Sequence, residues 1–386
     1  MTLQTLTGKQ IVVAVTGSIA AVETVKLIHE LRRRGADIQP VMSAAATGLI
    51  SPEALTYASG KQTITEISGT VEHVLFCGDG GSADLLLIAP CTANTIGKIA
   101  CGIDDTPVTT FATTALGSGI PLLIVPAMHH SMYRHPAVTA NIRRIRTWGV
   151  GIIDPRIEEG KAKIAGTEEI VLWCERAVMG QPLKGRRVLI TSGPCRERVD
   201  DVRILTTRSG GLMGRALALQ AFRLGADVTV VHADRFPCVN NVHAERADEM
   251  RAAVMNVISG GEGADIYISA AAISDFAPRP VTGKIPSGKA VRLGLEPLPK
   301  LLDEVLRNPP PVVIAFKLGT GQEKKAAAML RRGVSMVLVN TPDTMGSSSG
   351  EYLELTPAGT RPLSGTKESI AVAVWDTICR TLLSCP

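Results

Sequence analysis

The chain has 386 residues, of which 45% are hydrophobic and 20% charged, enough for two domains with cores of their own. Aromatic residues are only 3% and the net charge is a mild +5, so binding to nucleic acid through base stacking is poorly supported. The short basic clusters at 31–35 and 141–146 fall on expected helices and are more simply solvated faces. A modest positive excess does suit small anionic ligands.

The eight cysteines form no CxxC pair, which indicates reduced thiols and argues against a disulfide framework or a zinc ribbon. The N-terminal stretch "MTLQTLTGKQ" is too polar for a signal peptide, and no apolar run is long enough to span a membrane. We therefore expect a cytoplasmic protein with no membrane or nucleic-acid partner.

The first half opens with a buried strand, Ile11 to Val15, and a small-residue turn, Thr16-Gly17-Ser18. A helix to Arg34, which ends at Gly35, and a second strand follow. Turns of small residues join strands to helices with or without a bound phosphate, so "TGSIAA" alone is a weak signal. A GxGxxG motif is absent, and an ordinary NAD site is poorly supported.

The second half repeats this scheme from Lys184, with a strand at 188–191, a loop rich in Gly and Ser, and a helix from about Met213. The stretch "MGQPLKG" at 179–185 predicts the boundary, which gives domains at 1–181 and 182–386. We expect an α/β protein with two doubly wound, Rossmann-like domains. Ligands of such sheets bind at the carboxyl ends of the strands.

Further along the first half, a strand at 85–89 precedes a polar loop at 90–95, and "PLLIVPAMHHSMYRHP" again reads as a strand followed by a loop. That loop contains His129, His130 and His135, whose closeness raises the question of a zinc site. Zinc needs ligands on facing positions and a fourth group, so we predict no metal bound by these side chains.

The combination of "TGSIAA", "EHVLF", "APCTANT" and "PAMHHSMY" closely resembles the flavin-dependent cysteine decarboxylase family. The resemblance implies a flavodoxin-like fold for the first half. The segments "TSGP", "DDVRILTTRSGGLMG" and "AAISDFAPRP" of the second half resemble phosphopantothenate–cysteine ligase. This order of fusion is that of the bifunctional coenzyme A biosynthesis enzymes, and the resemblance spans nearly the whole chain.

The resemblance implies roles for residues of the first half. His73 would be the catalytic base, although by itself it could be a histidine satisfied at a strand end. Asn94 would contact both the flavin and the substrate. The FMN phosphate would be held by Gly17, Ser18 and Ser43, and the substrate carboxylate would be gripped by Met128, His129 and Met132. His129 stands where the family has an asparagine.

The chemistry explains the need for FMN. Loss of CO2 from a cysteine residue would leave an unstabilised carbanion, whereas oxidation of CH2–SH to a thioaldehyde places an electron sink beta to the carboxylate. The cofactor performs the redox steps, and the protein supplies position and proton transfer.

Many family members carry a proton-donating cysteine in a glycine-rich flap, which here corresponds to residues 154–171 and contains none. Lys161, Lys163 or a flap glutamate could supply the proton, or these could be solvated charges. The alternatives are an enzyme that completes only the oxidative half of the reaction and a flavin-binding regulatory or scaffold relative. A prenyl-flavin synthase of the same fold is disfavoured by the attached ligase half.

In the second half, the resemblance implies a nucleoside triphosphate, CTP or ATP, with Mg2+ screening its phosphates. The nucleotide would be bound by Gly193, Ser209, Gly210, Gly211, Gly214, Ser269, Ala270, Ala271, Asp275, Lys284, Phe316 and Arg332. Thr207 replaces an asparagine that handles the acyl-nucleotide. By itself Phe316 would more often be a core residue, and Arg332 could equally be a surface charge at a helix end.

The expected substrates are 4'-phosphopantothenate, cysteine and 4'-phosphopantothenoylcysteine. The resemblance also implies a homo-oligomer, with trimeric flavin domains and dimeric ligase domains.

Overall fold

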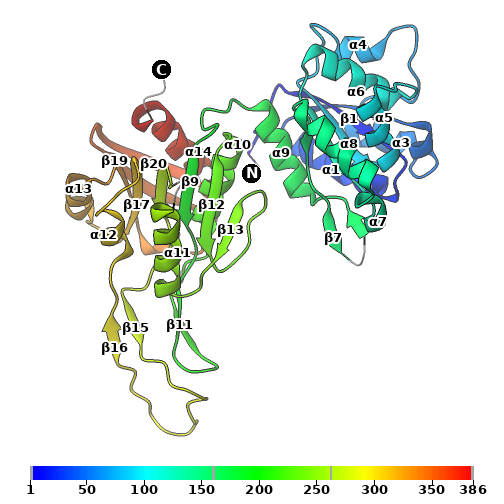
Figure 1. Ribbon diagram of the computed structural model, residues 1–386. Coiled ribbons are helices and arrows are strands. Elements are labelled where there is room, and N and C mark those ends of the chain that lie inside the picture. Colours follow the sequence, from blue (N-terminus) through cyan, green and yellow to red (C-terminus); the bar gives the residue numbers. More distant parts are fainter. Residues whose placement is uncertain (1–2, 159–160, 261–262, 384–386) are drawn as a thin grey trace. The chain divides into compact units, whose positions relative to one another are not determined.

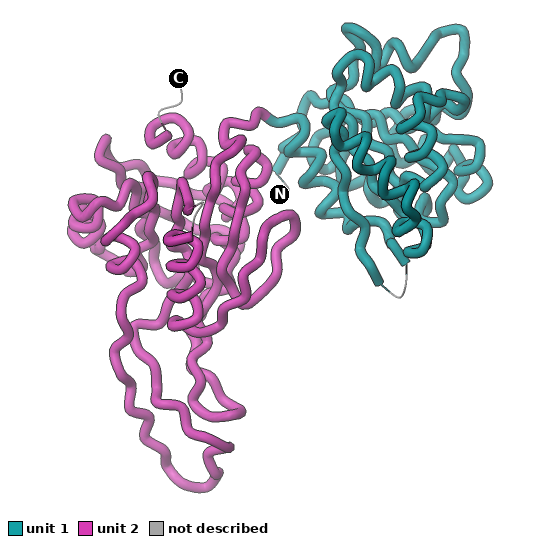
Figure 2. The backbone as a smooth tube through the Cα atoms, viewed as in Figure 1, with its two compact units in different colours: residues 1–179 teal, residues 180–386 magenta. Residues whose placement is uncertain are grey.

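A computed structural model describes residues 3–158, 161–260 and 263–383 (Figure 1). The chain forms two compact units, residues 1–179 and residues 180–386 (Figure 2). In the described residues, no helix is long and apolar enough to cross a membrane. Each unit is built around its own central β-sheet, and the two are described separately below.

The sheet of the first unit has five parallel strands in the order β2-β1-β3-β4-β6. Strand β1 is almost wholly buried, as the unbroken apolar run predicts for a sheet covered on both faces. The strand bounds are β1 Gln10–Val15, β2 Asp37–Met42, β3 Leu85–Cys91, β4 Leu122–Pro126 and β6 Gly151–Ile152.

Helices cover both faces of this sheet. Alternate residues of β1 point to opposite sides: Val13 belongs to a core that includes residues of α1, α3 and α9, and Val12 belongs to a core that includes residues of α5, α6 and α8. The helices are η1 Ile19–Glu23, α1 Thr24–Arg33, α2 Ala44–Thr47, α3 Pro52–Ser59, α4 Glu72–Cys77, α5 Ala93–Cys101, α6 Pro107–Ser118, α7 His130–Tyr133, α8 Pro136–Thr147 and α9 Thr167–Val178. The first unit is therefore doubly wound, as predicted.

A small antiparallel sheet lies beside the main one, in the order β5-β8-β7. Strand β5 (Met128–His129) belongs to the histidine-rich loop, whereas β7 (Arg156–Glu158) and β8 (Lys161–Lys163) form the flap. The pairing places Met128 opposite Ala162 and His129 opposite Lys161. The flap is thus joined through backbone hydrogen bonds to the segment that the resemblance assigns to substrate binding.

The sheet of the second unit has eight strands in the order β13-β12-β9-β14-β17-β18-β19-β20. It is parallel as far as β18 and antiparallel over the last two strands, an extension that was not predicted from the sequence. The bounds are β9 Arg187–Thr191, β12 Asp227–His232, β13 Asn240–His243, β14 Ile266–Ser269, β17 Val312–Leu318, β18 Met336–Asn340, β19 Ser349–Thr356 and β20 Gly359–Thr366.

Helices α11, α12 and α13 share one core with this sheet. Helix α10 packs against α14, where the indole N–H of buried Trp375 donates to the Leu217 carbonyl at 2.9 Å. The helices are α10 Leu212–Arg223, α11 Ala247–Ser259, α12 Leu301–Val305, α13 Glu323–Arg331, η2 Pro342–Thr344, α14 Lys367–Thr377 and η3 Ile378–Leu382. Two ribbons extend from the body of this unit (Figure 1): β10 Arg196–Arg198 with β11 Ile204–Thr206, and β15 Phe276–Pro278 with β16 Leu295–Pro297.

Two local expectations need correction. The loop expected at 90–95 is shorter, because β3 continues to Cys91 and the Thr92 hydroxyl accepts from the Thr95 amide at 3.3 Å, so that helix α5 begins at Ala93. Asn94 therefore lies in the first turn of a helix. His73 lies in helix α4 and not at a strand end, and its Nδ1 is buried without a hydrogen-bond partner in the described structure.

Candidate active sites

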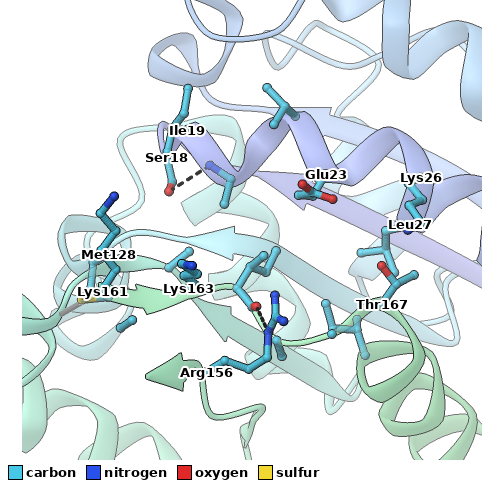
Figure 3. Close-up of a pocket in the computed structure, with 18 of the residues that line it drawn as sticks. Ser18, Ile19, Glu23, Lys26, Leu27, Met128, Arg156, Lys161, Lys163 and Thr167 are labelled. Carbon is cyan, nitrogen blue, oxygen red and sulfur yellow. Dashed lines mark hydrogen bonds between the residues drawn. The ribbon is translucent and has the colours of Figure 1, made fainter. Parts of the chain in front are cut away.

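A cavity of about 720 Å³ opens at the carboxyl ends of β1 and β4 in the first unit. Its walls come from the turn after β1, helix α1, strand β5 and the flap (Figure 3). Ser18, Met128 and Lys161 lie at one end of it, and Lys26 and Thr167 lie at the other. This is the place where a parallel sheet is expected to bind its ligand.

The turn after β1 is held in one shape by its neighbours. The Thr16 hydroxyl donates to the Pro90 carbonyl at 2.8 Å and accepts from the Thr92 amide at 3.0 Å, which ties the ends of β1 and β3 together. A Cβ on Gly17 would lie 2.6 Å from Cβ of Ala45, so only glycine fits there without movement. Ser18 caps helix η1 and lines the cavity.

Three buried polar atoms of the first unit have no hydrogen-bond partner in the described structure: Ser43 Oγ, His73 Nδ1 and His130 Nδ1. Such atoms carry a free-energy penalty unless a ligand or water satisfies them. The His73 ring also meets the edge of Phe111, with 6.5 Å between the ring centroids.

Only some of the expected flavin and substrate residues share the cavity. Ser18, Met128, His129, Lys161 and Lys163 line it. The other expected residues of the first unit do not line the cavity: Gly17, Ser43, His73, Asn94 and Met132. Asn94 and Met132 are exposed. Arg156, Glu23 and Lys26 line the cavity although no motif marks them.

The three neighbouring histidines have separate surroundings. His129 Nδ1 accepts from the Ser131 amide at 3.4 Å and lies 2.9 Å from the Ser131 hydroxyl, so the other ring nitrogen, Nε2, is left to donate. His135 Nδ1 accepts from the Ala137 amide at 3.2 Å and caps helix α8. His130 Nδ1 is buried, with no hydrogen-bond partner among the described residues. In the parts of the chain that the structure describes, no cluster of three His, Cys, Asp or Glu could hold a metal.

The two lysines of the flap have different surroundings. The Lys163 ammonium pairs with the Glu158 carboxylate at 3.2 Å, and Glu158 also lies 3.6 Å from the Arg156 guanidinium. Lys161 is exposed, lines the cavity and stands opposite His129. Of the flap glutamates, Glu159 lies outside the described residues.

The second unit has a smaller pocket of about 150 Å³ at the carboxyl ends of β14, β17 and β18, beside the N-terminus of α10. Six of the expected nucleotide residues line it: Ser209, Gly210, Gly211, Ala270, Ala271 and Phe316. The Phe316 ring meets that of Tyr352 at 90°. The pocket thus lies where the sequence predicts phosphate binding.

The glycine-rich loop packs tightly against the loop after β9. A Cβ on Gly214 would lie 2.2 Å from the Ser192 hydroxyl, and that hydroxyl donates to the Gly211 carbonyl at 3.2 Å. Gly193 and Gly211 both have positive φ, +81° and +69°, which side chains rarely adopt.

Several expected residues of the second unit lie outside this pocket. Lys284 lines a different cavity, of about 770 Å³, in the β15–β16 ribbon, and exposed Asp275 precedes β15. Arg332 caps the end of α13 and pairs with Asp303 at 2.7 Å. Gly193, Gly214 and Ser269 lie beside the pocket without lining it.

Thr207 Oγ1 is a buried atom without a partner in the described structure. Several lining residues were not anticipated, among them Asn340, Tyr352 and Lys367. Asn340 ends β18, Tyr352 lies in β19 and Lys367 begins α14, and no motif marks them.

Two family models cover the chain. The model described as "Flavoprotein" matches residues 2–179, and the one described as "DNA/pantothenate metabolism flavoprotein C-terminal domain" matches residues 183–382. The protein is thus a flavoprotein module followed by a module of that pantothenate-metabolism type.

The same order of modules occurs in proteins named "Coenzyme A biosynthesis bifunctional protein CoaBC". The one from Thermococcus kodakarensis is 43% identical over 98% of this chain and 96% of its own length. The one from Methanocaldococcus jannaschii is 34% identical over 98% of this chain and 95% of its own length. A solved structure titled as the C-terminal domain of CoaBC is 29% identical, with a TM-score of 0.43, and covers 53% of this chain and 98% of that one.

The chain belongs to the CoaBC family of coenzyme A biosynthesis bifunctional proteins. It is an enzyme of coenzyme A biosynthesis with a decarboxylase half and a ligase half. The predicted family, the α/β fold class and the bifunctional activity are confirmed.

Proposed function

We propose that the second unit joins cysteine to 4'-phosphopantothenate through an acyl-nucleotide, and that the first unit decarboxylates the product to 4'-phosphopantetheine with FMN. The observation that carries this proposal is the 720 Å³ cavity in which the turn after β1, the Met128–His129 strand and the flap meet. Its position, in a chain of this family, supports a cysteine-derived substrate held between a flavin and the flap.

The residues present fit FMN. Ser43 Oγ is a buried hydroxyl oxygen with no hydrogen-bond partner in the described part of the chain, and the Gly17 position has no room for a side chain beside Ala45. Together with Ser18, these residues would hold the phosphate. When bound, FMN supplies the two-electron oxidation and reduction that the decarboxylation requires.

The protein's own residues then account for substrate binding and proton transfer. His129, with Nδ1 accepting from the Ser131 amide, would donate from Nε2 to the substrate carboxylate between Met128 and Met132. His73 would act as the base, and Asn94 would hydrogen-bond flavin and substrate. Because His73 and Asn94 lie outside the cavity of a single chain, we propose that a neighbouring subunit of a trimer completes the site.

Lys161 is our candidate for the proton donor that replaces the flap cysteine. It lines the cavity opposite His129, whereas the ammonium of Lys163 is already paired with Glu158. An ammonium held beside a developing thiolate can donate a proton to the neighbouring carbon, which is general-acid catalysis.

In the ligase half, the loop at Ser209–Gly211 would bind the phosphates of CTP or ATP, with Phe316, Ala270 and Ala271 along the nucleotide. Lys284 and Asp275 would approach from the β15–β16 ribbon, within a dimer of ligase units. Gly193, Gly214, Ser269 and Arg332 would support that site, and Thr207 would take the place of the family's asparagine toward the acyl-nucleotide. Mg2+ would be carried mainly by the phosphates themselves. A cytoplasmic location stays a prediction.

The proposal is tested by incubating the FMN-loaded chain with 4'-phosphopantothenate, cysteine, Mg2+ and either CTP or ATP, and following products by mass spectrometry. We expect 4'-phosphopantothenoylcysteine to form with at least one nucleotide and then to lose CO2. Failure to form the amide with either nucleotide would refute the ligase assignment, and an amide that never loses CO2 would refute the decarboxylase assignment.

A further inference from the structure

Lys367, the first residue of helix α14, is a buried cation in the ligase-half pocket. Only 6% of the residue is exposed. Among the described residues that line this pocket, Lys367 is the one that carries a charge, and none is Asp or Glu. The pocket therefore contains a positive charge with no negative charge to balance it.

The contacts of the Lys367 ammonium are neutral. It donates to the Thr344 carbonyl at 3.1 Å and to the Tyr352 hydroxyl, and Nζ lies 4.6 Å from the centroid of the Tyr352 ring. An ammonium has three N–H donors, so these two bonds leave one. Within the described residues no carboxylate pairs with it, and burial alone lowers the pKa of Lys367 to about 8.

This arrangement is unfavourable for folding by itself. Removing an ammonium from water without an opposite charge is costly. Its place in the first turn of the 11-residue α14 also puts a cation at the positive end of the helix dipole. A methionine could fill the same space without either penalty, so the packing of the side chain does not explain a lysine.

A second source of positive potential faces the same pocket. The 12-residue helix α10 begins there, with Leu212 and Met213 among the lining residues. Its cap, Gly211, offers no side chain to the free N–H groups of the first turn. Backbone donors and the Lys367 ammonium thus surround one small space.

We propose that Lys367 is a phosphate-binding residue of the ligase half, in which its ammonium pairs with a phosphate oxygen held also by the first-turn N–H groups of α10. The phosphate is that of the nucleotide or that of 4'-phosphopantothenate, and this inference rests on the ligase function proposed above. Tyr352 and Thr344 position the ammonium through the two hydrogen bonds that they accept.

The test is isothermal titration calorimetry of the full chain with three ligands in turn: CTP with Mg2+, ATP with Mg2+, and 4'-phosphopantothenate. Lys367→Met removes the charge and keeps the length of the side chain, and Lys325→Met is the matched control on an exposed lysine of α13. Loss of a charge-assisted contact predicts about 10- to 100-fold weaker binding of one ligand class to Lys367→Met. Lys325→Met should bind like the unmodified chain.

The ligand that is affected identifies the source of the phosphate: weaker nucleotide binding indicates a nucleotide phosphate, and weaker binding of 4'-phosphopantothenate indicates the phosphate of that substrate. Equal affinity of Lys367→Met and the unmodified chain for all three ligands would overturn the proposal. If the unmodified chain bound none of them, the ligase function itself would be refuted, and this inference with it.

A measurement on the unmodified chain covers the case in which Lys367→Met does not fold. Because the protonated amine binds the anion, the affinity for the ligand whose phosphate contacts Lys367 should fall about tenfold between pH 7 and pH 9, as Lys367 loses its proton. Tyr352 is the other titratable group of the described pocket, and burial raises its pKa, so it stays neutral over this range. An affinity that is constant across this range would also overturn the proposal.

Discussion

Replacement of Gly17 by alanine should disrupt the flavin site through a single steric contact. The new Cβ would lie 2.6 Å from Cβ of Ala45, about 1 Å closer than carbon atoms normally approach. Neither residue has positive φ, so backbone conformation does not limit the substitution. Either the turn at 16–18 or helix α2 must move, and overpacking of this kind costs about 1–3 kcal/mol.

If that strain is relieved by displacing the turn, FMN affinity should fall by about 5- to 150-fold, the same energy expressed as a binding constant. The assay is titration of FMN into the flavin-free protein, followed by flavin fluorescence. The control is the double variant Gly17→Ala/Ala45→Gly, which removes the 2.6 Å contact and leaves neighbours at 3.2 and 3.3 Å. We expect it to recover most of the affinity, with Ala45→Gly alone near that of the unmodified protein.

Two results would contradict a steric role of Gly17 in the flavin site. FMN affinity that is unchanged in Gly17→Ala would mean that the turn does not hold the phosphate. Equal weakening in the single and the double variant would mean that the contact with Ala45 is not the cause, since coupled positions must deviate from additivity.

Three further predictions concern other parts of the chain. Lys161→Gln should slow the reduction step of the decarboxylation about 10²- to 10⁴-fold. Lys163→Gln should change the rate of that step little, because the Lys163 ammonium is paired with Glu158. Stopped-flow absorbance of the flavin measures both rates, and equal effects of the two variants would count against Lys161 as the acid. His73→Asn should abolish CO2 release and leave ligation intact; parallel loss of both activities would contradict the assignment of one activity to each unit. Trp375→Phe should lower the free energy of unfolding of the second unit by about 1–3 kcal/mol, because the variant loses the hydrogen bond to the Leu217 carbonyl and leaves a cavity. An unchanged denaturation midpoint would contradict that packing.

Much of the fold could be predicted because local signals and tertiary structure agree. The run from Ile11 to Val15 is a buried strand, Gly35 with φ of +94° follows the end of helix α1, and the repeated strand–turn–helix starts became two doubly wound units. In each case the residues that decide the structure are adjacent in sequence.

The parts that escaped prediction depend on pairing between distant segments. Strand β5 has two residues, too few for an alternating pattern, and its pairing with the flap places Lys161 opposite His129 across 32 positions of sequence. The antiparallel extension after β18 similarly brings Tyr352 and Lys367 to the ligase pocket. The start of α5 was missed because a threonine cap is also an ordinary loop residue.

We propose that the first unit completes the decarboxylation without a flap cysteine. The most direct measurement is mass spectrometry of an anaerobic incubation of the FMN-loaded chain with 4'-phosphopantothenoylcysteine, together with the absorbance of the flavin. We predict a product lighter by CO2 alone, with the flavin oxidised at the end. A product lighter by CO2 and two hydrogens, with reduced flavin left behind, would contradict the claim, and no product at all would indicate a regulatory flavoprotein.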